Sequence, residues 1–529
     1  MVNLSGTPVM LLKDETEHIK GKKALTINIE VIRAVSETIR TTFGPKGLNK
    51  MIVDSLGDIT VTNDGAKILD EIGVENSAAK MIVELSKTIH KNVGDGVSSS
   101  VIFIGELLAK TLDLITLGIS PTQIYEGYLR AMKEVNKHLK SVAFSADSVD
   151  LQILSKLAHT VLNSKVSTED NDKMVLLITR SLLSICENHD NHSTIDLDNI
   201  QIVKKEGKSL SESSLIEGVI IDKEVVNPMM PKYIENAQIA LLDGSLEIIK
   251  TDFSAEIQIT NPNEISSFVE KEKTMIEDLI KSLAETGVNV VFCQKGIDEL
   301  AQNFLNKSHI MAIRRVKHSD MKKLSRATGA RIITQVKGIS QNDLGFAQIV
   351  SEKRIGKENM IFVEKCKLPK AVTILIRGGT EIITDDAERA LKNGLAAVKS
   401  YIENPFYVSG AGSIEIELRR HLLQYAQKIG GKEQIAIEQY ADAIEILPKI
   451  LVENSGEDPL DIITTLRSKT NMAKKQYFGY DALSGKIVDP VQTGIIEPLQ
   501  VKLKVFSLAT ELAVTFIRID DYIRASRPH

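Results

Sequence analysis

The sequence predicts a multidomain protein of mixed α and α/β class, with helical blocks at both chain ends and an α/β block between them. Three observations lead to this prediction. The chain has 529 residues, enough for about three or four domain-sized cores. Apolar residues recur at helical spacing in roughly the first 145 and the last hundred residues. Between about residues 218 and 368, β-prone runs alternate with amphipathic segments, which is typical of an α/β layer.

The N-terminal block is expected to consist of helices separated by glycine turns. Residues 27–42 have helical spacing and stop before a Gly-Pro pair. Two β-prone runs in residues 51–62 predict a hairpin. Further helices are expected to begin near residues 63–65 and 76–77, and a long helix is predicted over residues 97–117.

The middle of the chain is predicted to hold strands with some parallel pairing, at residues 239–242, 288–292, 309–313 and 330–334. No GxGxxG motif follows any of them, which disfavours a dinucleotide site. Helical spacing returns over residues 386–403 and through most of the last hundred residues. One economical arrangement is a discontinuous domain built from both chain ends, with the middle of the chain inserted into it.

Composition excludes several classes of function. The formal net charge is −5 and no basic stripe with interleaved aromatics occurs, so no nucleic-acid partner is expected. Three scattered cysteines without metal-ligand spacing indicate a reduced compartment. The N-terminus lacks a signal-peptide pattern, and no stretch reaches the roughly 18 apolar residues that span a bilayer. We therefore expect a cytoplasmic protein with no membrane partner.

The strongest local motif is a glycine–aspartate–glycine turn followed by three serines at the start of the long predicted helix. Free N–H groups at a helix start favour phosphate, the hydroxyls could donate to it, and Asp95 could hold magnesium beside it. From spacing alone, an ordinary turn with a serine-rich helix start is the simpler interpretation. The turn around Gly44-Pro45 and the cap at Asp64 are equally ordinary in isolation. The ten histidines form no ligand cluster and are expected to lie mostly on the surface.

The order and the amino-acid sequences of these motifs, however, resemble those of the group II chaperonins. This is the family of the archaeal thermosomes and the eukaryotic cytosolic chaperonin TRiC. The resemblance extends over nearly the whole chain and favours a divergent archaeal thermosome paralogue. It is carried by the segments TTFGPKGLNKMIVDSLGDITVTNDGAKIL, AAKMIVELSKTIHKNVGDG, GISPTQIYEGY, IDKEVVNPMMPKYIENAQIALLD, VTILIRGGTEIITDDAERAL, YADAIEILPKILVENSGEDP, GIIEPLQVK and RIDD.

The resemblance implies the chaperonin fold, with three domains. A discontinuous, helical, ATP-binding equatorial domain would take residues 1–148 and 403–529. A small intermediate domain would take residues 149–216 and 370–402. An α/β apical, substrate-binding domain would take residues 217–369 and carry a helical lid protrusion near residues 245–277.

The resemblance also implies a site for ATP and Mg²⁺. Asp95 would hold the metal ion, and Asp64 and position 393 would act on the attacking water. Lid or substrate contacts are expected at Leu246, Ile248, Ile249 and Phe253, although packing roles are equally open to them. The nucleotide itself would be bound by Thr42, Gly44, Pro45, Gly94, Asp95, Gly96, Val97, Ser98, Ser99, Ser100, Lys165, Gly410, Ala411, Gly412 and Glu497.

Three positions depart from the family pattern. Val97 stands where the family has a threonine, and a hydroxyl bond lost to a charged group costs about 1.5–3 kcal/mol. Ala411 interrupts the family's glycine triplet. Asn393 replaces the aspartate that activates water, and an amide cannot take a proton at neutral pH. Asp386 lies about 10 Å away along the helix axis, which leaves Asp64 as the remaining carboxylate.

The expected function is that of an ATP-dependent protein-folding chaperone, a double-ring ATPase subunit that encloses unfolded polypeptides. Asn393 and Val97 favour an alternative within the same fold: a subunit that binds ATP but hydrolyses it weakly, in a ring shared with sister subunits. A phosphate-binding metabolic enzyme is a third interpretation, but no motif for a small-substrate pocket supports it.

Overall fold

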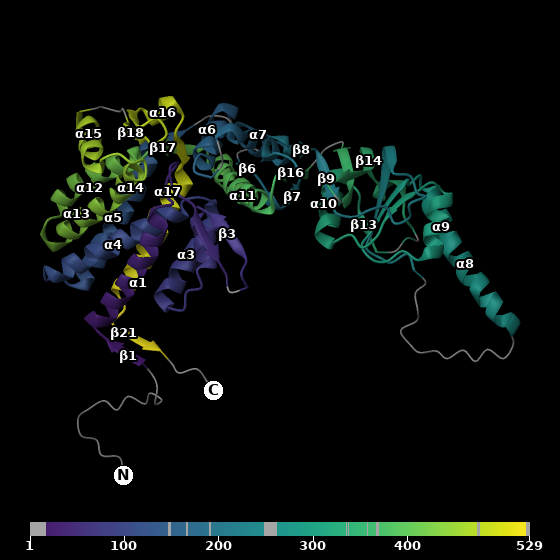
Figure 1. Cartoon of the computed structure of the whole chain (residues 1–529), viewed down its shortest axis with the longest axis horizontal. Helices are drawn as coiled ribbons and strands as arrows, with labels where there is room; N and C mark the ends of the chain where they lie inside the picture. The colour runs from purple at the N-terminus through teal and green to yellow at the C-terminus, as the bar shows by residue number, and fades with distance from the viewer. Residues whose placement is uncertain are drawn as a thin grey trace, which may run out of the picture. The chain divides into compact units, whose positions relative to one another are not determined.

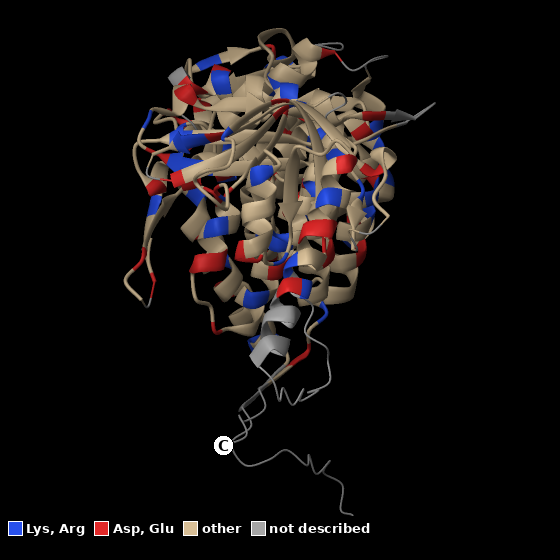
Figure 2. Ribbon diagram, turned by 90° about the vertical axis from the view of Figure 1, so that its right-hand side faces the viewer, with Lys and Arg blue, Asp and Glu red and all other residues tan. Residues whose placement is uncertain are grey.

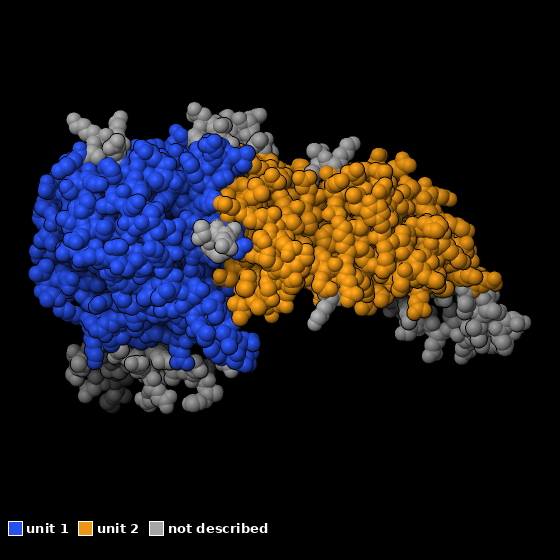
Figure 3. Space-filling model, turned by 45° about the horizontal axis from the view of Figure 1, so that its top comes forward, with its two compact units in different colours: residues 1–171, 389–529 blue, residues 172–388 orange. Residues whose placement is uncertain are grey.

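The computed structural model describes residues 17–54, 56–145, 150–165, 168–189, 192–247, 262–334, 336, 338–356, 358–366, 370–472 and 477–524 (Figure 1). The chain divides into two units (Figure 3). Unit 1 comprises Met1–Asn171 and Arg389–His529, and unit 2 comprises Asp172–Glu388. Unit 1 thus contains both chain ends. The finer division into three domains, with the boundaries given above, stays a prediction.

Unit 1 is a bundle of helices around one hydrophobic core. Its central helix is α4 (Val97–Thr116), which is buried on most of its surface because other helices surround it. Phe103 of α4 packs edge-on against Tyr440 and Phe506. The other long helices of the bundle are α1 (Lys22–Arg40), α3 (Ser77–Val93), α5 (Pro121–Val142), α12 (Ser413–Ile429), α13 (Gly431–Ile444) and α17 (Leu499–Ile517).

Shorter elements complete unit 1. The predicted hairpin is present as β2 (Lys50–Val53) and β3 (Ile59–Thr62), and β1 (Glu17–Lys20) pairs with β21 (Asp521–Arg524), so that the two ends of the described chain lie together. The others are α2 (Gly65–Glu71), β4 (Phe144–Ser145), α6 (Leu151–Leu162), β17 (Phe406–Ser409), α14 (Ile446–Glu453), α15 (Pro459–Met472), β18 (Gly479–Asp481), β19 (Lys486–Val488), α16 (Pro490–Thr493) and β20 (Ile496–Pro498).

Two helices cross the limits between the units: α7 (Thr168–Ile185) and α11 (Glu381–Glu403). The second matches the helix predicted from residue 386 onward. Its buried face carries Ala390, Leu391, Leu395 and Val398 at helical spacing. This apolar face fixes the rotation of α11 and therefore the direction in which Asn393 points.

Unit 2 contains a mixed seven-stranded sheet in the order β12-β11-β10-β14-β15-β9, with β13 also paired to β10. The predicted parallel pairing is present among β10, β11 and β12. The antiparallel part, not predicted from the sequence, is formed by β14, β15 and β9. The strands are β9 (Gly218–Ile221), β10 (Tyr233–Leu242), β11 (Val290–Cys293), β12 (Met311–Ile313), β13 (Ile332–Ile333), β14 (Gly345–Ile355) and β15 (Glu358–Cys366).

Helices α8 (Pro262–Glu285), α9 (Glu299–Lys307) and α10 (His318–Thr328) belong to the same unit, which also holds a three-stranded sheet of β7 (Ile200–Glu206), β16 (Val372–Gly378) and β8 (Ser214–Ile216). A small hairpin, β5 (Glu187–His189) with β6 (His192–Thr194), precedes them. Acidic and basic residues are interspersed along the helices that face the viewer in Figure 2.

The predicted lid residues are placed only in part. Ile248, Ile249 and Phe253 lie outside the described residues. Leu246 forms a bridge to Ile297 and is 2% exposed within the core of unit 2. Of the two roles left open for Leu246, packing fits its position, because its side chain is part of the core. Of the described helices, none has the length and apolar character needed to cross a membrane.

Candidate functional site

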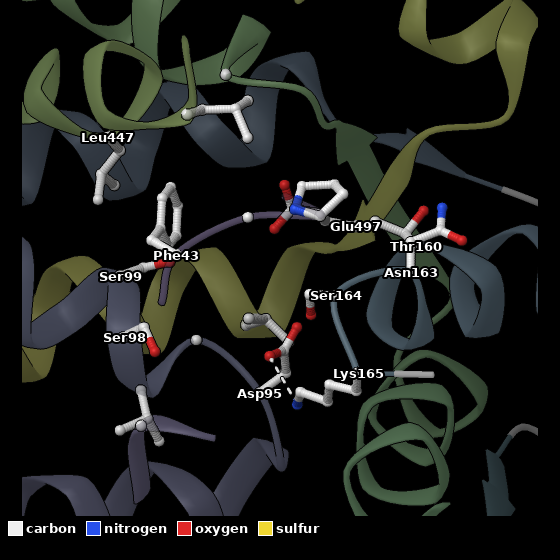
Figure 4. A pocket seen from close by; sticks show the side chains of 18 of the residues that line it. Phe43, Asp95, Ser98, Ser99, Thr160, Asn163, Ser164, Lys165, Leu447 and Glu497 are labelled. Atoms are coloured by element: carbon white, nitrogen blue, oxygen red, sulfur yellow. Dashed lines mark ion pairs between the residues drawn. The ribbon is translucent and has the colours of Figure 1, made fainter. Parts of the chain in front are cut away.

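A pocket in unit 1 is lined by residues from both ends of the chain (Figure 4). The N-terminal part supplies the stretches around Gly44, Asp64 and Asp95 and the turn that carries Lys165. The C-terminal part supplies Asn393 and residues from α12, α14, β20 and α17. Since these stretches are hundreds of residues apart, only the folded unit assembles the pocket.

One wall of the pocket is the turn between α3 and α4. Gly94 and Gly96 both have left-handed backbone conformations, with φ of 70° and 87°. A Cβ at Gly96 would lie 2.5 Å from Cγ2 of Val505, so only glycine lets α4 begin this close to α17. No side chain caps the helix start. Its free N–H groups therefore remain available to an anion.

The serines after this turn do not all face the pocket. Ser98 and Ser99 line it, as Figure 4 shows. Ser100 does not, because its buried hydroxyl donates to the Gly96 carbonyl at 2.9 Å. Val97 lines the pocket but is almost fully buried and belongs to the hydrophobic core. The predicted hydroxyl donors are thus reduced to two.

Lys165 lies at the centre of the charged residues of the pocket. Its Nζ is 3.7 Å from Oδ2 of Asp64 and 3.8 Å from Oδ1 of Asp95. The second ion pair is drawn as a dashed line in Figure 4. The turn that carries Lys165 is held in place because Asn63 donates a hydrogen bond to the carbonyl of Ser164. Asn63 was not singled out in the sequence, since it reads there as part of a cap.

Asp64 and Asn393 contact each other directly. The amide Nδ2 of Asn393 donates to Oδ2 of Asp64 at 2.6 Å, and Oδ1 of Asp64 accepts from the N–H of Lys67 as the N-cap of α2. Burial raises the pKa of the Asp64 carboxyl, but the Lys165 charge and these hydrogen bonds outweigh burial and hold it below its usual value. Asp64 is therefore ionised at neutral pH.

Asn393 is 1% exposed, and its Oδ1 has no hydrogen-bond partner among the described residues. A buried amide oxygen without a hydrogen bond costs folding free energy. This oxygen can therefore accept a hydrogen bond from a donor that enters the pocket. Helix α11 brings Asn393 to this place by packing against the end of α3. A Cβ at Gly94 would lie 3.0 Å from the Asn393 carbonyl oxygen.

A second group of charged residues also lines the pocket. Lys502 of α17 is buried and bonds Glu415 Oε1 at 2.7 Å and Glu497 Oε2 at 2.8 Å. Burial raises the pKa of the Glu497 carboxyl, and the nearby Glu415 charge adds to this, against the pull of Lys502. The sequence pointed to Glu497 only. The one signal for Lys502 in the sequence is that this charged residue interrupts the apolar run of the last long helix.

Glycines shape the region beside these carboxylates. Gly44 has a φ of 84°, and a Cβ there would lie 2.7 Å from Cδ1 of Leu451. A Cβ at Gly412 would lie 2.6 Å from Cβ of Pro448. Ala411 lines the pocket with a left-handed φ of 57°, a conformation that a non-glycine residue adopts at a cost. Gly410 does not line the pocket.

An apolar surface completes the site. Phe43, Leu447 and Leu451 line it, with Tyr480 next to them. A pocket that joins an apolar surface, acceptor carboxylates and free N–H groups fits a ligand with a flat ring, hydroxyls and phosphates. Most of the predicted site residues are thus brought together: Thr42, Gly44, Pro45, Asp64, Gly94, Asp95, Gly96, Val97, Ser98, Ser99, Lys165, Asn393, Ala411, Gly412 and Glu497.

The donor set also fits magnesium. Within the described part of the chain, no group of three or more histidine, cysteine or carboxylate side chains is arranged to hold a metal ion alone. Mg²⁺ is usually held by one or two carboxylates together with phosphates and water. Asp95, which lies beside the anion-binding helix start, matches that mode.

Comparison with known proteins gives consistent matches. Residues 35–527 match the TCP-1/cpn60 chaperonin family. The chain is 45% identical to a thermosome subunit of Pyrococcus horikoshii over 527 residues, which cover 100% of this chain and 96% of that protein. It is 44% identical to a thermosome subunit alpha of Archaeoglobus fulgidus, covering 99% and 96% of the two chains. Identity to a thermosome subunit beta of Sulfurisphaera tokodaii is 44%, covering 99% and 95%.

Proposed function

This chain belongs to the TCP-1/cpn60 chaperonin family, and from this premise we propose that unit 1 binds ATP with Mg²⁺ but hydrolyses ATP slowly in its own pocket. The chain is a group II chaperonin subunit, a protein-folding chaperone of a ring complex. Family members are ATPases. The single observation that carries the finer proposal is the amide of Asn393 bonded to Asp64 at 2.6 Å.

Nucleotide binding is supported by three neighbouring chemistries in one pocket. The start of α4 offers N–H groups and the hydroxyls of Ser98 and Ser99 to phosphates. Glu497 offers an acceptor for sugar hydroxyls, and Phe43 and Leu447 offer an apolar surface for a base. When bound, Mg²⁺ would neutralise charge on the phosphates, and Asp95 is the side chain that would hold it.

Slow hydrolysis follows from the protonation chemistry of Asp64 and Asn393. General-base catalysis needs a group that takes a proton from water in the transition state. The Asn393 amide can orient water but cannot accept that proton. Asp64 is a weak base, because both its oxygens already accept hydrogen bonds and its pKa lies below the usual value. The Lys165 charge beside it is one cause of this lowered pKa.

At the level of the assembly, we propose two alternatives. In one, the chain works as an ordinary ATP-driven subunit that encloses unfolded polypeptides. In the other, it is a specialised subunit of a hetero-oligomeric double ring, in which sister subunits supply most of the hydrolysis. Asn393 favours the second alternative. A metabolic enzyme with a small substrate is disfavoured, since the match to the chaperonin family extends over residues 35–527.

Calorimetric titration of the purified chain with ATP and Mg²⁺ tests the binding step. We expect one site per chain, and we expect Asp95→Asn to weaken Mg²⁺-dependent binding while leaving fold and solubility unchanged. Asp113→Asn, which makes the same change on an exposed face of α4, is the matched control. Absence of binding at millimolar ATP would refute the proposal.

Native mass spectrometry separates the two assembly alternatives. Rings formed by the chain alone, with ordinary phosphate release, would support the first. Rings that form only when sister subunits are added, together with slow release by the isolated chain, would support the second.

A further inference from the structure

His90 is a titratable side chain of the pocket that has no part in the nucleotide binding proposed above. It lies on the last turn of α3 and lines the pocket. It is half-buried, and neither ring nitrogen has a hydrogen-bond partner among the described residues. The sequence predicted only that most histidines lie on the surface and did not single out His90. An imidazole without hydrogen bonds inside a binding pocket is free to act on a ligand.

The position of His90 relative to the reacting groups follows from two observations. Its charge acts on Asp64 and is one of the causes that lower the pKa of that carboxyl, after burial, Lys165 and the two hydrogen bonds. Gly94, one helical turn after His90, donates its N–H to the His90 carbonyl and packs against the backbone of Asn393. His90, Asp64 and Asn393 therefore meet at the same wall.

Neither Asp64 nor Asn393 is an effective proton acceptor, and histidine is the side-chain type that exchanges a proton near neutral pH. Resting on the nucleotide function proposed above, we propose that His90 accepts the proton of the water that attacks the γ-phosphate of bound ATP. Asn393 then acts beside it, since its unpartnered Oδ1 can accept the other O–H of the same water and hold that water in place.

The step balances without any further reactant. A bond forms between the water oxygen and the γ-phosphorus, while the bond from that phosphorus to the β–γ bridging oxygen breaks. The water proton passes to the neutral imidazole of His90, and the imidazolium later releases it to solvent. The products are ADP and inorganic phosphate, and nothing is oxidised or reduced. His90 must be neutral at the start, so the rate should increase as His90 loses its proton.

A purely electrostatic role is the competing interpretation. Protonated His90 would then only stabilise the charge of Asp64, and free imidazole would not restore the rate once His90 is removed. Several other charged groups line the same pocket and remain in place in a His90 variant. They are Asp64, Asp95, Lys165, Glu415, Asp481, Glu497 and Lys502. The pH profile measured with and without His90 shows whether this residue causes the pH dependence, and rescue by free imidazole separates the two roles.

The test is single-turnover ATP hydrolysis by the purified full chain between about pH 5.5 and 8.5, for wild type, His90→Gln and the control His318→Gln in unit 2. We expect the wild-type rate to rise roughly tenfold per pH unit at the acid end and then level off. His90→Gln should be about 10²-fold slower at pH 8, with a flat profile. His318→Gln should match wild type. A wild-type profile in His90→Gln would overturn the proposal.

Two further measurements test whether His90→Gln loses only proton transfer and not ATP binding. The ATP affinity of His90→Gln, measured by calorimetry, should stay within about threefold of wild type. If the wild type itself binds no ATP, the proposed function is refuted, and this inference falls with it. Free imidazole should restore hydrolysis to His90→Ala in proportion to its neutral form. No rescue, in a variant that still binds ATP, would contradict proton transfer at residue 90.

Discussion

At the scale of single residues, the pocket depends on what stands at position 393. Asn393 gives Asp64 a hydrogen bond of 2.6 Å, where a second carboxylate would face it with like charge. The amide therefore keeps Asp64 ionised and holds the pair in place. However, an amide at position 393 cannot accept a proton from water, as a carboxylate there could. Asp64 and Asn393 are 329 residues apart in sequence, so their hydrogen bond could not be read from either motif.

Asn393→Asp should raise the ATP turnover of the isolated chain by about 10²–10⁴-fold, because it restores a carboxylate base. The two carboxylates would titrate as a coupled pair, so the gain should shrink at acid pH as one proton is shared. Steady-state phosphate release measures the effect. Asn393→Ala, which removes the amide without adding a base, should show no gain. A similar rise in both variants would mean that position 393 acts through packing.

Ala411→Gly should raise the free energy of unfolding by about 1 kcal/mol. Ala411 holds a left-handed φ of 57°, which costs a non-glycine residue roughly 1–2 kcal/mol, partly offset by the entropy that glycine loses on folding. Urea denaturation monitored by circular dichroism measures the difference. Ala143→Gly at an ordinary backbone position should destabilise or leave the protein unchanged. Destabilisation by Ala411→Gly would show that the methyl group contributes more by packing than its backbone costs.

At the scale of elements, sequence patterns predicted what is local. Helix α4, the β2–β3 hairpin and the parallel strands β10 to β12 follow from spacing and turn residues near one another in the chain. The hairpin β14–β15 was missed, because charged residues interrupt its apolar pattern. The ion pairs of Lys502 with Glu415 and Glu497 were missed as well, since they join separate elements and carry no local signature.

An ion cluster around the buried Glu445 also joins separate elements, namely α12, α14 and α15. Glu445 is fully buried and bonds Arg419, Lys449 and Arg467. Burial raises the pKa of the Glu445 carboxyl, but the three cations outweigh it and lower the pKa below its usual value. The cluster should therefore stabilise unit 1 fully above the unfolded-state pKa of about 4.3. This stabilisation should be lost as the pH falls toward the lowered folded value.

Glu445→Gln should lower the free energy of unfolding by about 1.5–3 kcal/mol at pH 7, because it removes the charge that bonds Arg419 and the partly exposed Lys449 and Arg467. Urea denaturation at pH 7 and near pH 3 measures the loss, which should be smaller at the lower pH. Glu457→Gln, in an exposed turn, should change stability by less than about 0.5 kcal/mol. Equal losses at both pH values would argue against the charge as the cause.

At the scale of the whole molecule, unit 1 is closed by strands and helices from both chain ends, and the pocket lies among them. A ligand that binds only the folded pocket stabilises the unit by about 2.7 kcal/mol at a hundredfold excess over Kd. Saturating ATP should therefore slow hydrogen exchange in α4 and α17 together. Protection confined to the N-terminal segments would mean that the C-terminal wall does not take part in binding.

We propose above all that the pocket beside Asn393 binds ATP but hydrolyses it only slowly. The direct measurement follows the fate of radiolabelled ATP bound to the purified chain, with Mg²⁺ present, in wild type and Asn393→Asp under single-turnover conditions. We predict that the wild type retains mostly the triphosphate over a period in which Asn393→Asp converts it completely to ADP. Conversion at equal rates in the two proteins would contradict the account.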